Sequence, residues 1–414
     1  MKRCTWMILG ALLFAATGFC QGILERRVRY TLLEESHLVD DCLVCGRPAI
    51  IEPLRGTFDL VLLREIGPYT WYAVENVQFT TSGLRQRSLS GKGSFTRFEE
   101  FARVQTMQLH ASITDEQTTL TAWFTNSGPA ILPPEPLMDV TLAQTNGTPL
   151  QTFSLRLLAA PVREVWFSTS AGFGSTNRNA PTNWISDGML LSNLGRVVRY
   201  NHQLAGRLGV MPVVPDLGLD AVHVGLAGLT CFSIPKNTFS ESQGLIQHGD
   251  LLSSRGQIVK RNQDLLAAFN PQNTNDAGLD AVCISTNGEV LFSIQSNVVV
   301  SSTLTLHPGD LLSDQGKVVV PHRRLLEKFQ PASSVLDDYG LDALHILPHG
   351  EIWFSVERGF TDAVLGPVDA GDLLSNLGYR VFRNQDLTAP FGPGAGKSYG
   401  LDALFVIADT EPPR

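Results

Sequence analysis

The segment YGLDALHILPHGEIWFSV, from Tyr339 to Val356, decides the fold. An Asp stands inside a first apolar run, a short segment with Gly follows, and a second apolar run ends in Phe-Ser. Two short apolar runs joined by a few residues that include Gly are typical of a β-hairpin. Asp342 is the unusual residue, because a carboxylate is seldom buried in a strand without a partner.

This hairpin pattern occurs four times, and its Asp recurs about every 60 residues, at 220, 280, 342 and 402. Each unit also carries a third apolar segment, GDLLS in units two to four and MLLS in the first, and a fourth run after the next Gly. Four strands in a unit of this size, repeated four times, predict a β-propeller rather than a solenoid, whose coils are shorter.

The order of the runs predicts how the ring closes. The repeat region begins with the FS run EVWFS at 164–168 and ends with the LDA run GLDALFV at 400–406. The LDA strand that would precede the first FS strand therefore stands at the other end of the repeat region. If the last LDA strand pairs with the first FS strand, a fourth blade is completed, so we expect a closed four-bladed propeller over residues 161–414.

A family resemblance supports this blade count. The stretch LDALHILPHGEIWFSVERGF resembles the hemopexin repeat, which has an Asp-Ala strand, a short turn with Gly and an aromatic strand. The resemblance covers about 20 residues per unit and implies a four-bladed propeller, although the units here are longer and GDLLS departs from that pattern. The FS…GDLLS…LDAL order is also similar to repeats of uncharacterised exported bacterial proteins, which implies a family but no activity.

The N-terminal part, residues 21–160, lacks the repeat. It holds several runs of alternating apolar and polar residues, among them GTFDLVLL, YTWYAVENVQFTT and TLTAWFT. Their spacing predicts a β-sandwich or jelly roll. We therefore expect an all-β protein of two modules, with the boundary near Ala160 and Pro161.

The first 20 residues predict export. Lys2 and Arg3 form a basic start, residues 6–16 are mostly apolar, and small residues precede position 21. This is the pattern of a cleaved signal peptide over residues 1–20, with lipid attachment at Cys20 or an uncleaved anchor as alternatives. No later stretch is long and apolar enough to span a membrane. We therefore expect a secreted, periplasmic or cell-surface protein.

The net charge and the cysteines indicate which kinds of binding site are not expected. The net charge is −8 and Lys and Arg form no long basic run, so nucleic-acid binding is not expected. Cys42 and Cys45 form a lone CxxC, for which a local disulfide is the favoured interpretation in an exported protein, with half a zinc site or a redox pair as alternatives. Cys231 and Cys283 replace bulky strand residues and are expected to be free thiols.

The repeated Asp has two interpretations. Because it recurs in every unit, the favoured one is structural: each carboxylate accepts backbone N–H bonds and fixes its own turn. The alternative is a ring of carboxylates that binds a hard cation such as Ca²⁺. Neighbours ~6 Å apart would repel by roughly 3 kcal/mol per pair at an effective dielectric near 20, so the ring needs donors or an ion. These residues are Asp220, Asp280, Asp342 and Asp402; the Asp of GDLLS, at 250, 310 and 372, is expected to cap a turn.

No sequence motif identifies a reaction, and the GxSxG, HExxH and P-loop patterns are absent from the sequence. We therefore favour a non-enzymatic binding or scaffolding protein that acts on a glycan or protein through a propeller face. The alternative is a carbohydrate-active hydrolase that uses unrepeated carboxylates such as Glu241, Glu357 and Asp362. The longest loop, 168–188, supplies the candidate binding residues Phe173, Asn177, Arg178, Asn183 and Trp184.

Overall fold

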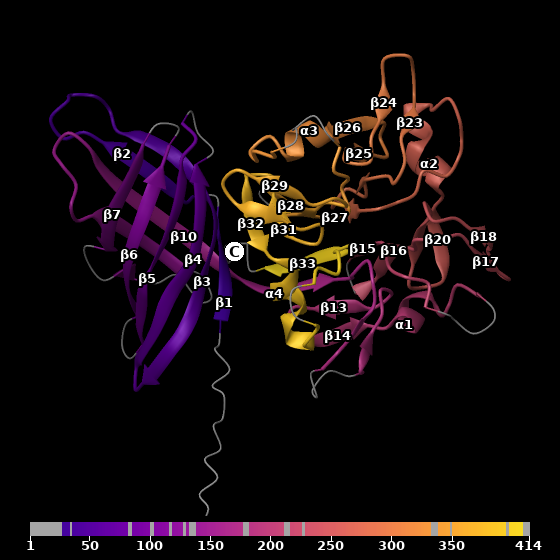
Figure 1. Ribbon diagram of the computed structural model, residues 1–414, viewed down its shortest axis with the longest axis horizontal. Helices are drawn as coiled ribbons and strands as arrows, with labels where there is room; N and C mark the ends of the chain where they lie inside the picture. The colour runs from indigo at the N-terminus through magenta and orange to yellow at the C-terminus, as the bar shows by residue number, and fades with distance from the viewer. Residues whose placement is uncertain are drawn as a thin grey trace, which may run out of the picture.

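Figure 1 shows the computed structural model, in which an N-terminal β-module and a ring of four small sheets lie side by side. The structure describes residues 27–408 apart from 34, 82–84, 100–102, 116–117, 127–129, 132–137, 177–181, 211–215, 226–227, 333–337, 348–349 and 395–396. The expected signal peptide and two of the expected binding residues, Asn177 and Arg178, lie outside the described residues.

The N-terminal module is one antiparallel sheet that closes on itself. From β3 to β7 each strand pairs with the next one, β7 pairs with β9 and β9 with β10, and the short β8 pairs with β6. Both β1 and β2 lie between β3 and β10 and pair with each of them, which closes the sheet. Most neighbouring strands of the sheet are also neighbours in sequence, so the connections do not cross over as they do in a jelly roll. The strands are β1 (Arg27–Leu32), β2 (His37–Asp41), β3 (Ile50–Ile66), β4 (Tyr69–Thr81), β5 (Ser88–Glu99), β6 (Arg103–Thr114), β7 (Thr119–Asn126), β8 (Ala130–Ile131), β9 (Met138–Gln144) and β10 (Thr152–Phe167).

The core of this module lies inside the closed sheet. Side chains alternate between the two faces of a strand. In β6, Met107, Leu109 and Ala111 are buried, whereas the intervening Gln108 is exposed. The inward side chains of all the long strands form one apolar cluster, which explains the alternation seen in the sequence.

Strand β10 belongs to both modules. Its first part pairs with β9, β2 and β1, and its last residues pair with β33 (Leu404–Ala408) and β13 (Leu190–Ser192). The expected boundary at Ala160 and Pro161 therefore falls within one continuous strand. Beside it, the guanidinium of Arg29 in β1 lies 4.1 Å from the ring centre of Phe382 in the propeller.

The predicted four-bladed propeller is confirmed, including its closure, because β33 pairs with β10 to complete the first blade. In chain order the other strands of the blades are β13 and β14 (Arg196–Arg199); β15 (Ala221–Val224), β16 (Thr230–Ser233), β19 (Leu251–Ser253) and β20 (Gln257–Lys260); β21 (Val282–Ile284), β22 (Val290–Phe292), β25 (Leu311–Ser313) and β26 (Lys317–Val320); β27 (Ala343–Ile346), β28 (Ile352–Ser355), β31 (Leu373–Ser375) and β32 (Tyr379–Phe382).

Each blade also carries a two-stranded hairpin and a short helical segment. The hairpins are β11 (Phe173–Gly174) with β12 (Trp184–Ile185), β17 (Thr238–Ser240) with β18 (Gly244–Ile246), β23 (Val298–Val299) with β24 (Thr305–Leu306), and β29 (Phe360–Asp362) with β30 (Gly366–Val368). The helices are α1 (Asn201–Ala205), α2 (Asn262–Leu266), α3 (His322–Leu325) and α4 (Asn384–Thr388), with the 3-10 turns η2 (Ala267–Phe269) and η3 (Ala389–Phe391). Within the described part of the chain, none of the helices has the length and apolar character needed to cross a membrane.

The serine of each FS run joins its blade to the next one. The Ser293 hydroxyl of the third blade donates to the Leu341 carbonyl of the fourth at 2.7 Å. The other three contacts are equivalent and complete the circle: Ser168 to Leu219 at 2.8 Å, Ser233 to Leu279 at 2.8 Å, and Ser355 to Leu401 at 2.7 Å. We call these four hydrogen bonds the serine clasps. All four serines are fully buried, so each clasp satisfies groups that water cannot reach.

The turns within the second and fourth blades are held by an Asp and an Asn. In the second blade, the Asp250 carboxylate accepts the backbone N–H groups of Gln247 and Asn262, which is the expected turn-capping role. The Asn262 amide donates to the Gly249 and Gly278 carbonyls at 3.4 and 3.1 Å. A Cβ at Gly249 would lie 2.3 Å from the Asn262 nitrogen, which explains the Gly before this Asp. Asp310 and Asp372 accept the equivalent backbone bonds in the third and fourth blades.

Candidate functional site

The repeated aspartates come together where the four innermost strands of the propeller begin. Each lies one or two residues before the innermost strand of its blade, and these four strands, β15, β21, β27 and β33, contact each other in a circle. Asp220, Asp280 and Asp342 are buried and Asp402 is partly buried. The charges of the other three all act on Asp342, so the four carboxylates form one cluster. We call this cluster, with the residues that contact it, the acidic mouth.

The partners of these carboxylates differ from the expected ones. In the described part of the chain, no backbone N–H donates to any of the four, so their expected role as turn-fixing acceptors is not observed. Instead, the Gln295 amide donates to Asp220 at 2.7 Å and to Asp280 at 3.1 Å. The Ser170 hydroxyl donates to Asp402. The donors are thus side chains from neighbouring segments, and they reach three of the four carboxylates.

The donors occupy one position of the repeat, two residues after the FS serine. That position holds Ser170, Pro235, Gln295 and Glu357 in the four units. Its place in the repeat is the same each time, but the type of side chain differs. A search for residues that are identical in the four units cannot find this position, because its residue differs in each of them. A Cβ at Gly340, which has φ +75°, would lie 2.6 Å from the Glu357 side chain. Gly340, two residues before Asp342, therefore leaves space for the Glu357 side chain, and the equivalent Gly278 and Gly400 leave space for Gln295 and Ser170.

Glu357 adds a fifth carboxylate to the acidic mouth. Its charge acts on all four aspartates. Burial, together with the charges of Asp402 and Glu357, raises the pKa of Asp220 to about 8. Burial likewise raises the pKa of Asp402 to about 6, although the Ser170 hydrogen bond opposes the shift. Burial and neighbouring charges hold the pKa values of Asp280 and Asp342 well above the ordinary value.

Two carboxylates of the acidic mouth have at least one oxygen without a hydrogen-bond partner among the described residues. Asp280 Oδ2 is buried and accepts no hydrogen bond from the described residues. The Asp342 carboxylate, which is only 7% exposed, likewise has no hydrogen-bond or ion-pair partner in the described part of the chain. No Lys or Arg is among the groups that shift the pKa values of the four aspartates. The mouth therefore has an excess of negative charge that protons or a cation would neutralise.

The carboxylates of the acidic mouth are of the chemical kind that binds a hard cation. Carboxylate oxygens are among the ligands that Ca²⁺ prefers, whereas Gln295 presents its amide nitrogen to Asp220 and Asp280. Among the described residues, no three His, Cys, Asp or Glu side chains already converge in a geometry that would hold a metal ion. An ion would therefore require the carboxylates to turn by a rotamer change toward the axis. Asp342, whose carboxylate has no hydrogen-bond partner among the described residues, is the most free to do so, whereas Asp280 would keep the bond from Gln295 on one oxygen only.

A second layer of side chains lies along the inner strands beside the acidic mouth. Three residues after each repeated Asp stand His223, Cys283, His345 and Phe405. His223 Nδ1 accepts the Ile284 N–H at 3.2 Å, and His345 Nδ1 accepts the Val406 N–H at 3.4 Å. Burial lowers the pKa of both rings, and with the help of His223 it lowers that of His345 to about 3. Both rings are thus neutral, with Nδ1 acting as an acceptor, and they connect blades rather than bind metal.

Of the binding residues expected in loop 168–188, the structure describes Phe173, Asn183 and Trp184. Phe173 is buried, with its ring centre 4.5 Å from that of Tyr399, so its expected role as a ligand contact is corrected to a core role. Asn183 and Trp184 are exposed, the latter by 60%. The loop begins at the acidic mouth, because Ser170 bonds to Asp402. The exposed Trp184 and the mouth are therefore connected through one loop.

The unrepeated carboxylates do not form a separate pair. Asp362 is buried and accepts the backbone N–H groups of Gln330, Val364 and Leu365, so it caps a turn. Glu241 is exposed, and only Glu357 belongs to the acidic mouth.

The cysteines are arranged in two ways. Cys42 and Cys45 are bonded as a disulfide, with their Cα atoms 5.5 Å apart, in a short turn after β2. Cys231 and Cys283 are free, and burial raises the pKa of both thiols. Neither free thiol is therefore in the environment that activates a nucleophilic cysteine.

Comparison of the sequence with models of protein families and with curated proteins found no match. The functional argument therefore rests on the geometry of the acidic mouth.

Proposed function

We propose that this chain is an exported binding or scaffolding protein whose acidic mouth holds a hard cation such as Ca²⁺. One observation carries the proposal. Five carboxylates gather at the acidic mouth, and within the described part of the chain only Gln295 and Ser170 donate side-chain hydrogen bonds to the four aspartates.

The energetic argument concerns charge. Two like charges ~6 Å apart repel by roughly 3 kcal/mol at an effective dielectric near 20, and a ring contains several such pairs. Burial adds a desolvation cost for the ionised forms of Asp220, Asp280 and Asp342. A divalent cation offsets both terms at neutral pH. It would also tie the four inner strands together at the point where the blades meet.

The proposed partner surface is the propeller face around loop 168–188. Its exposed aromatic residue, Trp184, is of the kind that packs on a sugar ring or an apolar peptide side chain. Because the loop starts at Ser170, which bonds to Asp402, a cation in the mouth would help to fix the position of the loop. We propose a glycan or a protein as the partner.

The test is a calorimetric titration of the mature chain, residues 21–414, with CaCl₂ after treatment with EDTA. We expect one cation per chain and a higher melting temperature in Ca²⁺. Asp342→Asn should weaken binding strongly, whereas Asp386→Asn, an exposed carboxylate on α4, should leave it unchanged. Absence of heat of binding for Ca²⁺, Mg²⁺ and Mn²⁺ would exclude the cation.

A hydrolase remains the second candidate, and Glu357 is the observation that favours it. It is an unrepeated carboxylate close enough to Asp280 for its charge to raise the pKa of that group. Glycosidases use two carboxyl groups roughly 5–9.5 Å apart, one of them with a raised pKa. A hydrolysis screen over a panel of glycans separates the two functions, because turnover that Glu357→Gln abolishes would support the hydrolase and reject a binding-only protein.

A further inference from the structure

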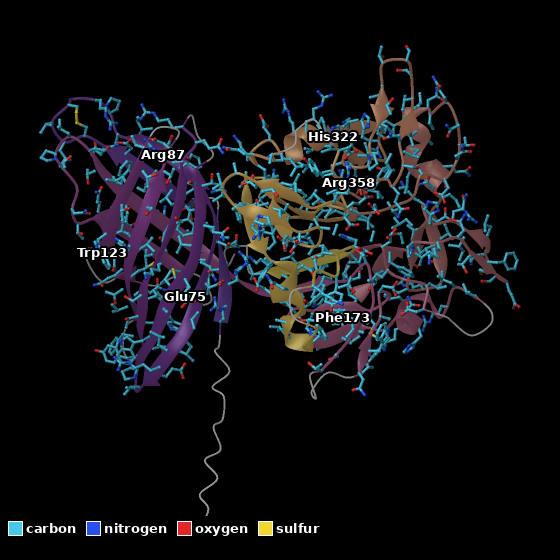
Figure 2. All side chains as sticks on the ribbon, viewed as in Figure 1. Glu75, Arg87, Trp123, Phe173, His322 and Arg358 are labelled. Carbon is cyan, nitrogen blue, oxygen red and sulfur yellow. A yellow bond between two sulfur atoms is a disulfide. The ribbon has the colours of Figure 1, made fainter. Side chains whose placement is uncertain are left out.

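A hollow of about 410 Å³ lies on the outer face of the N-terminal sheet, far in sequence from the propeller. It is formed by four neighbouring strands, β4, β5, β6 and β7. Figure 2 labels two of its residues, Trp123 and Glu75, on this sheet. Its volume falls within the range of roughly 300–1,000 Å³ that is usual for small-molecule sites.

Strand register explains why these side chains face the hollow together. Lys92 pairs with His110, which pairs with Trp123, so the three stand in one row across β5, β6 and β7. Ser94 pairs with Gln108 in a second row two residues away. The intervening positions along these strands point inward to the core. The two rows therefore form the walls of the hollow on the outer face.

The first row carries an exposed aromatic surface. Trp123 is 49% exposed, and its ring centre lies 4.6 Å from that of His110. Packing on His110 holds the indole in place while half of it stays open to solvent. A fixed and open indole face is suited to pack against the C–H groups of a sugar ring, with little loss of side-chain entropy on binding.

Of the two charged side chains that line the hollow, only the acidic one is in an ion pair with another described residue. The Glu75 carboxylate is paired with Arg27 at 2.9 Å, so its charge is compensated. Lys92 is exposed, and no ion pair engages its ammonium group in the described part of the chain. A ligand with a negative group would thus find one available cation beside the aromatic row. The amide of Gln108 and the hydroxyl of Ser94, both exposed, supply hydrogen-bonding groups on the opposite wall.

We propose that this hollow binds a pyranose ring that carries a carboxylate, that is, a uronic acid unit of a glycan. Trp123 packs against the ring, Lys92 pairs with the carboxylate, and Gln108 and Ser94 bond to hydroxyl groups. The site lies on the N-terminal module and does not depend on a cation in the propeller.

The test is isothermal titration of the whole mature chain with trigalacturonate and triglucuronate, and with the corresponding neutral trisaccharides, at low ionic strength. We expect the uronates to bind more tightly, and salt to reduce that preference. Trp123→Ala should weaken binding of the uronates by about tenfold or more, because it removes the packing surface. Lys92→Gln should reduce their affinity to that of the neutral sugars.

Two controls make the result decisive. Trp71→Ala removes an indole from the same sheet that does not line the hollow and should leave binding unchanged. Gln108→Ala, an exposed substitution, gives a second variant if Trp123→Ala proves unfolded by circular dichroism. The proposal is overturned if none of the four sugars binds, if the neutral sugars bind as tightly as the uronates, or if the variants of the hollow bind like the wild type.

Discussion

The serine clasps make a prediction about how the propeller is held closed. Ser293→Ala removes a fully buried hydroxyl and leaves the Leu341 carbonyl without its donor at 2.7 Å. A buried acceptor that loses its partner costs roughly 1–3 kcal/mol. For a chain of this size, each kcal/mol lowers the melting temperature by about 2–4 °C or less. We therefore expect a fall of several degrees in thermal unfolding followed by circular dichroism.

The same experiment tests whether the clasps act independently. Ser233→Ala removes the clasp between the second and third blades, and its cost should add to that of Ser293→Ala, because the two sites share no partner. Ser302→Ala is the matched control, since Ser302 is exposed in the hairpin of the third blade. If Ser293→Ala melts at the same temperature as Ser302→Ala, the clasps do not hold the blades together and the reasoning fails.

Three further predictions concern other parts of the chain. The pKa of His345 is about 3 in the folded state, whereas the ring in the unfolded chain takes up a proton below about pH 6.5. The free energy of unfolding should therefore fall as the pH drops between these two values, by up to about 1.4 kcal/mol per pH unit. His345→Phe, which copies Phe405 of the first blade, should flatten this slope in urea unfolding at pH 4 to 7; an unchanged slope would contradict it. Cys42→Ser opens the disulfide to Cys45 and should cost about 2 kcal/mol or less, and dithiothreitol should then have no further effect on melting. Asn262→Ala leaves the Gly278 carbonyl without its donor and should cost roughly 1–3 kcal/mol in the same melting assay; a neutral effect would show that its bonds are replaced by water.

The propeller was predictable because its evidence is periodic. A repeated Asp, a repeated FS run and one strand displaced from each end of the repeat define the blade, the number of blades and the closing pair without knowledge of any side-chain contact. The closure by β33 on β10 follows directly from that displacement. The role of the FS serine did not follow, because its acceptor, the Leu carbonyl of the next blade, lies about 50 residues away in sequence and is a backbone atom.

The acidic mouth was predictable only in part. The sequence indicated that the four aspartates share one environment, but it favoured backbone donors, which are available to a carboxylate in most turns. The structure shows instead that side chains approach from a position whose residues differ among units, Gln295 and Glu357 among them. Phe173 was misjudged for a related reason. Its loop folds back onto Tyr399, and neither the length nor the composition of a loop reveals which of its residues pack inward.

The order of the strands in the N-terminal sheet could not be predicted from the sequence. Alternation of apolar and polar residues shows which face of a strand is buried, but it does not show which other strand lies beside it. The strand that both modules share, β10, likewise has no sequence signal, since an apolar run continues across the expected boundary at Pro161.

The most direct test of the account is the melting temperature of the mature chain and of Asp342→Asn, measured at neutral pH in EDTA and across a titration with CaCl₂. If a cation neutralises the acidic mouth, Ca²⁺ raises the melting temperature of the wild type in proportion to the logarithm of its concentration above the Kd. In EDTA the substitution then stabilises the protein, because it removes one of the mutually repelling carboxylates, and it abolishes most of the response to Ca²⁺. A wild-type melting temperature that is the same in EDTA and in millimolar CaCl₂, MgCl₂ and MnCl₂, together with a loss of stability in Asp342→Asn, would contradict the cation and assign the carboxylates a purely structural role.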